Sequence, residues 1–155
     1  MRRSDRELKD REQILAVMKK CGVCRLALND GGYPYILPLN FGMEEKEGQL
    51  VLYFHGAEEG KKYELIKKDS RAGFEMDCSH ELVTKNGKDG CSCTMKYESV
   101  IGRGRIEPVP DGEKQDALCA LMRHYHEEEC AFNQAVLSRT RVFKLIVEQM
   151  SGKAR

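Results

Sequence analysis

The sequence predicts an α+β fold that is mainly antiparallel β, namely a small six-stranded barrel with flanking helices. Two strand-like segments are joined by the tight turn Asp30-Gly31-Gly32, which is typical of a hairpin. A third strand-like segment follows at once, and a short helix separates it from the next one, whereas a doubly wound sheet would alternate strands and helices. The chain has 155 residues, so we expect residues 1–155 to form a single domain.

Each element has a local signal. Asp10 can cap a helix that ends at Lys20, with Gly22 just past its end. Gly102 and Gly104 inside a long strand predict a bulge or a bend, which lets a small sheet close on itself. Residues 44–48 are expected to form a turn and residues 80–90 a mobile loop. The expected strands are 23–29, 33–41, 49–55, 71–79, 94–109 and 141–149, and further helices are expected at 61–68 and 111–125.

Composition argues against nucleic acid and membranes as partners. The 26 Lys plus Arg and 25 Asp plus Glu leave a net charge of +1, which creates no field that would collect polyanions. The longest uncharged stretch, residues 31–43, is shorter than the ~20 apolar residues of a membrane span. No apolar segment follows Arg2 and Arg3, so we expect no secretory signal and place the protein in the cytoplasm.

The seven cysteines are expected to be reduced thiols in that compartment. Cys21 and Cys24 form a C-x-x-C, but this motif follows a helix, whereas a redox C-x-x-C begins one, where the positive end of the helix dipole lowers the thiol pKa. Cys91 and Cys93 are closer together than the familiar zinc spacing. Ordinary thiols are therefore favoured, and a zinc-stapled regulatory domain is the alternative that metal analysis would decide.

A second metal-like pattern lies in residues 124–130. His126 and Cys130 are four residues apart, as on one face of a helix. The run nevertheless ends an amphipathic helix in a charge-rich stretch, so a solvated helix end is favoured over a ligand set. We expect no metal site.

A glycine loop followed by two lysines predicts an anion site. Gly56 ends a buried strand, and Gly60-Lys61-Lys62 begins a helix, where unpaired amides and ammonium groups suit a phosphate monoester. The glycines are too close for a Walker A loop, and Lys62 stands where Ser or Thr would be needed. The alternative is that both lysines are ordinary solvated helix residues.

Other catalytic motifs are missing from the sequence. Gly102-Arg103-Gly104 lies within a strand and lacks the third glycine of a dinucleotide fingerprint. There is no G-x-S-x-G, H-E-x-x-H or EF-hand pattern. The residues alone therefore indicate a small barrel with a phosphate site and do not name a reaction.

A series of short segments, in order along nearly the whole chain, carries a resemblance to a known family. These segments are Met1-Arg2-Arg3, Cys24-Arg25-Leu26-Ala27, Pro34-Tyr35-Ile36-Leu37-Pro38-Leu39-Asn40-Phe41-Gly42, Leu52-Tyr53-Phe54-His55, Gly60-Lys61-Lys62, Phe74-Glu75, residues 97–104 and Ser151-Gly152-Lys153. They resemble the nitroimidazole-resistance proteins, which belong to the pyridoxamine 5'-phosphate oxidase-like flavoproteins. The resemblance implies a split β-barrel that binds FMN at the interface of a homodimer.

The resemblance also implies which residues bind FMN. One strand would lie along the isoalloxazine ring, the next strand would lie beside it, the basic pair would contact the phosphate, and two residues would come from the neighbouring subunit. In that order, these residues are Ile36, Leu37, Pro38, Leu39 and Asn40, then Phe54 and His55, then Gly60, Lys61 and Lys62, and last Tyr97 and Ser99. His55 corresponds to the active-site histidine of the nitroimidazole-resistance proteins; the alternative is a structural histidine at a strand end.

The implied activity is that of an FMN-dependent oxidoreductase. It would pass electrons from NADH or NADPH to a small aromatic or nitroaromatic acceptor, with His55 as the catalytic residue. The alternatives are a non-catalytic flavin- or haem-binding protein of the same fold, or a pyridoxamine 5'-phosphate oxidase-like enzyme. The last is disfavoured because the substrate phosphate clamp of those enzymes is not evident near the C-terminus.

Overall fold

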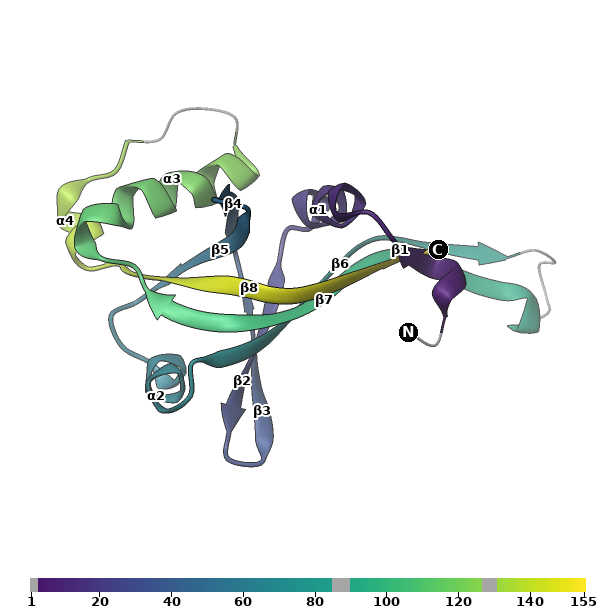
Figure 1. Ribbon diagram of the computed structural model, residues 1–155, viewed down its shortest axis with the longest axis horizontal. Helices are drawn as coiled ribbons and strands as arrows, with labels where there is room; N and C mark the ends of the chain where they lie inside the picture. Colours follow the sequence, from purple (N-terminus) through teal and green to yellow (C-terminus); the bar gives the residue numbers. More distant parts are fainter. Residues whose placement is uncertain (1–2, 85–89, 127–130) are drawn as a thin grey trace.

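The computed structural model describes residues 3–84, 90–126 and 131–155, and one antiparallel sheet dominates it (Figure 1). The strand order is β3-β2-β6-β7-β8-β5-β4, and the short β1 pairs with β8. The strands are β1 (Glu7–Leu8), β2 (Cys24–Asp30), β3 (Tyr33–Leu39), β4 (Gly42–Lys46), β5 (Gln49–Gly56), β6 (Arg71–Thr84), β7 (Cys93–Pro108) and β8 (Arg141–Ala154).

The mainly antiparallel α+β class is confirmed, but the prediction of six strands is two short. The sheet has eight strands, and its path is open between β3 and β4. The expected turn 44–48 is mostly strand β4, because Glu47 and Gly48, both at positive φ, suffice for a two-residue turn. The expected loop 80–90 is also wrong for residues 80–84, because β6 continues to Thr84 and pairs with β7 in an exposed ribbon without a buried face. Residues 85–89 of the expected loop lie outside the described part of the chain.

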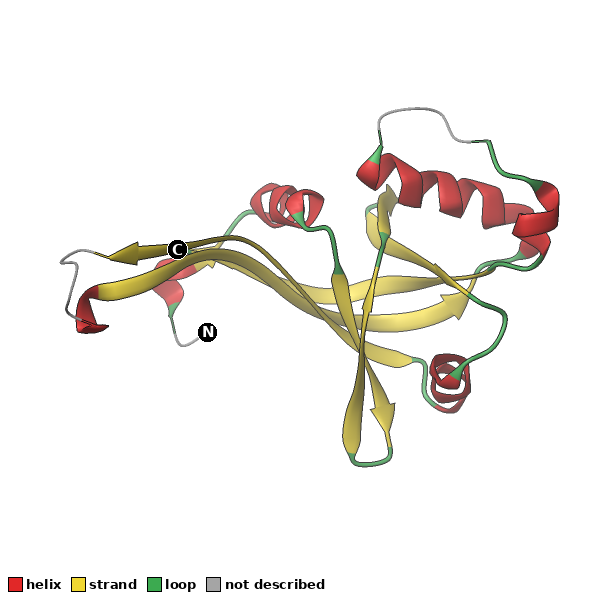
Figure 2. Cartoon of the chain, turned by 180° about the vertical axis from the view of Figure 1, so that it is seen from behind, coloured by secondary structure: helices red, strands yellow, loops and turns green. Residues whose placement is uncertain are grey.

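Helices flank the sheet on several sides (Figure 2). The predicted first and second helices are confirmed, although the Asp10 side chain makes no capping hydrogen bond. The third begins with a 3-10 turn at Asp111–Glu113. The α-helices are α1 (Arg11–Lys20), α2 (Lys61–Lys68), α3 (Lys114–Tyr125) and the unpredicted α4 (Gln134–Ser138), and further 3-10 turns lie at Ser4–Arg6 and Gly90–Ser92. Within the described ranges, no helix has the length and apolar character needed to cross a membrane.

Two hydrophobic clusters lie on opposite faces of β5. Phe54 belongs to the larger cluster, which is enclosed by the curved sheet, α1 and α2. Val51 and Tyr53 belong to the smaller one, beneath α3 and α4. Burial on both faces explains the continuous apolar run from Leu50 to Phe54. This run holds the end of β5, and with it the start of the Gly56–Gly60 loop, in a fixed place.

The irregularity predicted at Gly102 and Gly104 is found where β7 pairs with β8, but the extra, unpaired residue is Glu148 of β8. The register with β8 shifts between Arg103 and Gly104. A Cβ at Gly104 would collide with the backbone carbonyl of Ile146, and one at Gly102 with the ring of Phe74. Glycine is therefore required where β7 bends against its neighbours.

Candidate functional site

The predicted anion site lies where β5 ends and α2 begins. Gly60 is the N-cap of α2 at φ 144°, a conformation that favours glycine. A Cβ at Gly56 would lie 2.9 Å from both the Lys62 Nζ and the Tyr63 hydroxyl. The two glycines thus give the helix its start and let these side chains approach the strand backbone. The free amides and partial positive charge of the helix N-terminus face the same loop.

Lys61 faces away from this loop, toward the β2–β3 hairpin. Its Nζ lies 2.5 Å from the Asp30 carboxylate and 5.1 Å from the centre of the Tyr35 ring. The hydrogen bond to Asp30 raises the pKa of Lys61. Its charge is therefore already neutralised by the protein.

Lys62 and Arg141, in contrast, both make cation–π contacts with the ring of Tyr63. The Lys62 Nζ lies 4.5 Å and the Arg141 Cζ 4.3 Å from the ring centre. Arg141 also donates to the Glu58 carbonyl at 3.3 Å, and within the described residues no carboxylate pairs with either cation. The buried Tyr63 hydroxyl has no hydrogen-bond partner among the residues that the structure describes. We call Lys62, Tyr63 and Arg141 the cation cluster.

Neither Tyr63 nor Arg141 was expected from the sequence. Arg141 reaches the site because β8 pairs with β5, which places it opposite Gly56. No local motif surrounds it, so only the strand pairing could have pointed to it. The sequence predicted an anion site made of Gly60, Lys61 and Lys62. In the structure, the cations beside this loop are Lys62 and Arg141, which is distant in the sequence.

His55 stands beside this cluster, one residue before Gly56. Although the side chain is exposed, desolvation of the ring lowers the pKa of His55, and repulsion from the Lys62 ammonium lowers it further. The imidazole is therefore neutral at pH 7. In that form one ring nitrogen can accept a proton and the other can donate a hydrogen bond.

The strand assigned to the flavin ring is β3, at one edge of the sheet. Tyr35, Leu37 and Leu39 pack against the core, while Ile36 is 59% exposed. Within the described chain β3 pairs with β2 alone, which suits Pro34 and Pro38 because proline cannot donate to a ladder. Asn40 follows the strand and is also exposed. The free edge offers backbone groups to a ligand.

A groove of about 590 Å³ adjoins the β2–β3 hairpin on the outward face of the sheet. Its floor includes Ala27 and Gly73, which leave room for a flat group. Arg71 at its rim is bound to Asp69 at 2.8 Å, whereas Arg103 pairs with no carboxylate within the described residues. The lining residues are Ala27, Leu28, Asn29, Gly32, Tyr33, Pro34, Asp69, Arg71, Ala72, Gly73, Arg103, Gly104 and Glu148.

Three residues assigned by the resemblance lie elsewhere. The Phe54 side chain is fully buried and stacks on Phe143 at 5.3 Å, so it supports the site from within the core. Ser99 pairs with Lys153 near the far end of β8, and Tyr97 is bonded to Arg155. About a dozen residues of β8, roughly 40 Å of extended strand, separate that end from Arg141. Within one chain, Tyr97 and Ser99 are not brought to the cation cluster.

The residues of the metal-like pattern at 124–130 make contacts of another kind. His124 lies 2.7 Å from the Cys21 carbonyl oxygen and Tyr125 donates to the Gly22 carbonyl at 2.8 Å, so both anchor α3 to the α1–β2 loop. Tyr125 and His126 are nevertheless exposed, as expected of a solvated helix end. Cys130 lies outside the described residues. Within the described part of the chain, no group of three or more His, Cys, Asp or Glu side chains could hold a metal ion.

Comparison with known proteins identifies the family to which this fold belongs. The profile of the family described as pyridoxamine 5'-phosphate oxidase matches residues 10–154. A structure from Bacteroides thetaiotaomicron, provisionally described as a 5-nitroimidazole antibiotic resistance protein, is 30% identical with a TM-score of 0.82, covering 96% of this chain and 86% of that one. A search of curated proteins found no match.

Two more distant structures share the fold. One is the FAD and haem binding protein from Mycobacterium smegmatis, with 20% identity, a TM-score of 0.80 and coverage of 96% of this chain and 73% of that one. The other is the flavocytochrome Anf3 from Azotobacter vinelandii, with 19% identity, a TM-score of 0.79 and coverage of 100% and 72%. With the family profile spanning nearly the whole sequence, the chain belongs to the pyridoxamine 5'-phosphate oxidase-like family, whose split-barrel fold its antiparallel sheet and flanking helices adopt.

Proposed function

We propose that the protein binds FMN and passes electrons from NADH or NADPH to a small aromatic or nitroaromatic acceptor. The observation that carries this proposal is the cation cluster. Lys62 and Arg141 approach one ring without a carboxylate among the described residues, so their charges repel unless an anion lies between or beside them. A phosphate dianion would relieve this repulsion, meet the α2 N-terminus and offer an acceptor to the Tyr63 hydroxyl.

The residues present therefore fit a flavin phosphate, and bound flavin would supply the electron-transfer chemistry. Lys62 and Arg141 would hold the phosphate, whereas Lys61, paired with Asp30, would contribute little. The free edge of β3 would orient the ring by its backbone. His55, neutral at pH 7, would accept a proton at an imidazole nitrogen or donate a hydrogen bond to the acceptor.

A homodimer is part of the proposal. Because Tyr97 and Ser99 lie far from the cation cluster along β8, their assigned contact with the flavin requires a second subunit. Ile36 and Ile101, both more than half exposed on the outward sheet face, offer apolar surface to such a subunit. We also propose a cytoplasmic location, in keeping with the odd number of cysteines.

The second candidate is a non-catalytic flavin or haem binder. The FAD and haem binding protein of Mycobacterium smegmatis, which shares the fold, favours keeping it. The absorbance spectrum of the purified protein distinguishes flavin from haem, and reconstitution with FMN or FAD identifies the flavin. Turnover with NADH or NADPH and a panel of nitroaromatic acceptors then distinguishes an enzyme from a binding protein. A rate no higher than that of free FMN contradicts the proposed oxidoreductase activity.

A further inference from the structure

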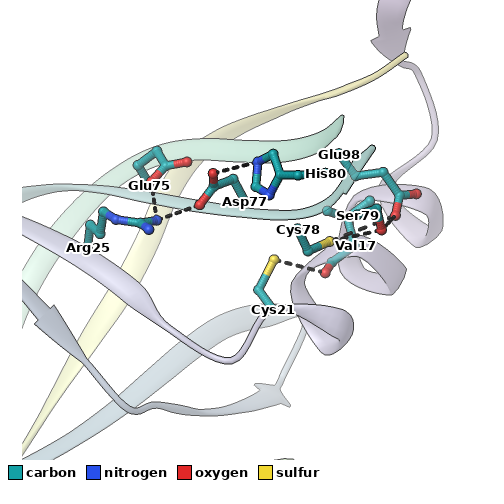
Figure 3. A network of polar contacts seen from close by, with 9 residues as sticks. All are labelled: Val17, Cys21, Arg25, Glu75, Asp77, Cys78, Ser79, His80 and Glu98. Carbon is teal, nitrogen blue, oxygen red and sulfur yellow. Dashed lines mark hydrogen bonds and ion pairs between the residues drawn. The ribbon is translucent and has the colours of Figure 1, made fainter. Parts of the chain in front are cut away.

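Two cysteine thiols meet where α1 ends and β6 passes beneath it (Figure 3). Cys21 is the residue after α1 and is 1% exposed, and its thiol donates to the Val17 carbonyl at 3.3 Å. Cys78 is half-buried on the face of β6 that packs against the core. Although they are far apart in the sequence, the two side chains lie close to each other, near enough to interact electrostatically (Figure 3).

Polar groups surround the Cys78 thiol. The Ser79 hydroxyl lies 3.6 Å from its sulfur, and the nearest Glu98 carboxylate oxygen lies 3.8 Å away. That carboxylate is held at 2.9 Å by the Lys20 ammonium, so its repulsion of a thiolate at Cys78 is offset by a cation. The more exposed Cys78 is thus the thiol that a reagent from solution can reach first.

Cys21 has the opposite character. Burial, followed by contact with the Cys78 thiol, raises the pKa of Cys21 to about 12. It therefore stays protonated and shielded until its neighbour reacts. A half-exposed thiol in contact with a shielded one is the arrangement of an attacking cysteine and a resolving cysteine.

We propose that Cys78 and Cys21 form a redox modification site, in which a hydroperoxide oxidises Cys78 and Cys21 then closes a disulfide between β6 and the end of α1. In the first step the Cys78 sulfur takes the distal oxygen of the hydroperoxide, the O–O bond breaks, and an alcohol, or water from hydrogen peroxide, leaves. In the second step the Cys21 thiol attacks the sulfenic acid, the S–S bond forms, and the hydroxyl leaves with the Cys21 proton as water. Two thiols and one hydroperoxide give one disulfide, one alcohol and one water.

The site differs from the C-x-x-C motif that the sequence presents. Cys24 is fully buried in β2, and burial raises its pKa, with nearby Glu75 a smaller cause. Its side chain belongs to the hydrophobic core. The partner of Cys21 is therefore Cys78, which is distant in the sequence, and Cys24 serves as the matched control.

The test treats the purified full-length protein, with and without added FMN, with one equivalent of hydrogen peroxide. Remaining thiols are blocked with iodoacetamide before trypsin digestion and mass spectrometry. Trypsin releases Cys21 and Cys24 together in peptide 21–25 and Cys78 in peptide 72–85. We expect these two peptides to appear cross-linked, with the mass lowered by two hydrogens, and dithiothreitol to separate them.

Two cysteine variants show which thiol of peptide 21–25 forms the cross-link. Cys24→Ala should keep the cross-link, whereas Cys21→Ala should abolish it and leave Cys78 as a sulfenic acid that dimedone traps. Circular dichroism checks that each variant folds. A disulfide confined to peptide 21–25, or a Cys78 that stays fully alkylated in the wild-type protein, overturns the proposal. Because the cross-link is measured without any turnover, its failure is independent of the flavin chemistry.

Discussion

Removing the cation cluster should weaken FMN binding far more than riboflavin binding. Lys62→Ala and Arg141→Ala each delete a cation that has no carboxylate partner within the described residues. A hydrogen bond to a charged group contributes about 1.5–3 kcal/mol, which corresponds to roughly 10- to 150-fold in Kd for each variant. Riboflavin lacks the phosphate, so its Kd should change by less than about threefold.

Lys61→Ala provides the comparison that the structure suggests. Its ammonium is bound to Asp30 at the surface, so it has little free charge to offer a phosphate. We therefore expect a loss of FMN affinity of at most about fivefold. Lys67→Ala, at the exposed end of the same helix, controls for general effects on α2.

The assay is titration of the apoprotein with FMN and with riboflavin, followed by quenching of flavin fluorescence at fixed ionic strength. Changing Lys61 and Lys62 together should match the loss from Lys62→Ala within about fivefold. Equal weakening of both flavins by Lys62→Ala would refute the phosphate assignment. A larger effect from Lys61→Ala than from Lys62→Ala would refute the division of roles between the two lysines.

Three further predictions concern catalysis, folding and assembly. His55→Ala should lower turnover by ~100-fold or more. It should also remove an inflection of the pH–rate profile that lies below the usual histidine pKa, since the neutral ring predominates at higher pH. An unchanged rate and pH profile would make His55 structural. Gly104→Ala should destabilise the fold by ~1–3 kcal/mol in thermal melts, because its Cβ meets the Ile146 carbonyl, while Gly22→Ala, with open space around it, should leave the melting temperature nearly unchanged. Added FMN should raise both the melting temperature and the dimer fraction in sedimentation, because a ligand of the assembled form stabilises it; a monomer that holds FMN tightly would contradict the shared site.

Local patterns predicted most of the elements because each depends on neighbouring residues. The turn glycines after Asp30 set the first hairpin, and the apolar run ending at Phe54 marked a strand buried on both faces. Two segments were misjudged where local signals are weak. The strand β4 carries more charged than apolar residues, and the distal part of β6 has no buried side to give it a period.

The sequence by itself determined the fold class, the irregular stretch at Gly102 and Gly104, and the glycine-lysine start of α2, since turns, periods and helix starts are short-range properties. The division of labour within the site was decided only by the tertiary structure. Consecutive helix residues point about 100° apart, so Lys61 meets Asp30 while Lys62 turns toward Gly56. Arg141 joins Lys62 because β8 pairs with β5, and Cys78 meets Cys21 because α1 packs on β6. Such contacts join residues far apart in the chain and arise from the packing of the whole sheet, which no local pattern encodes.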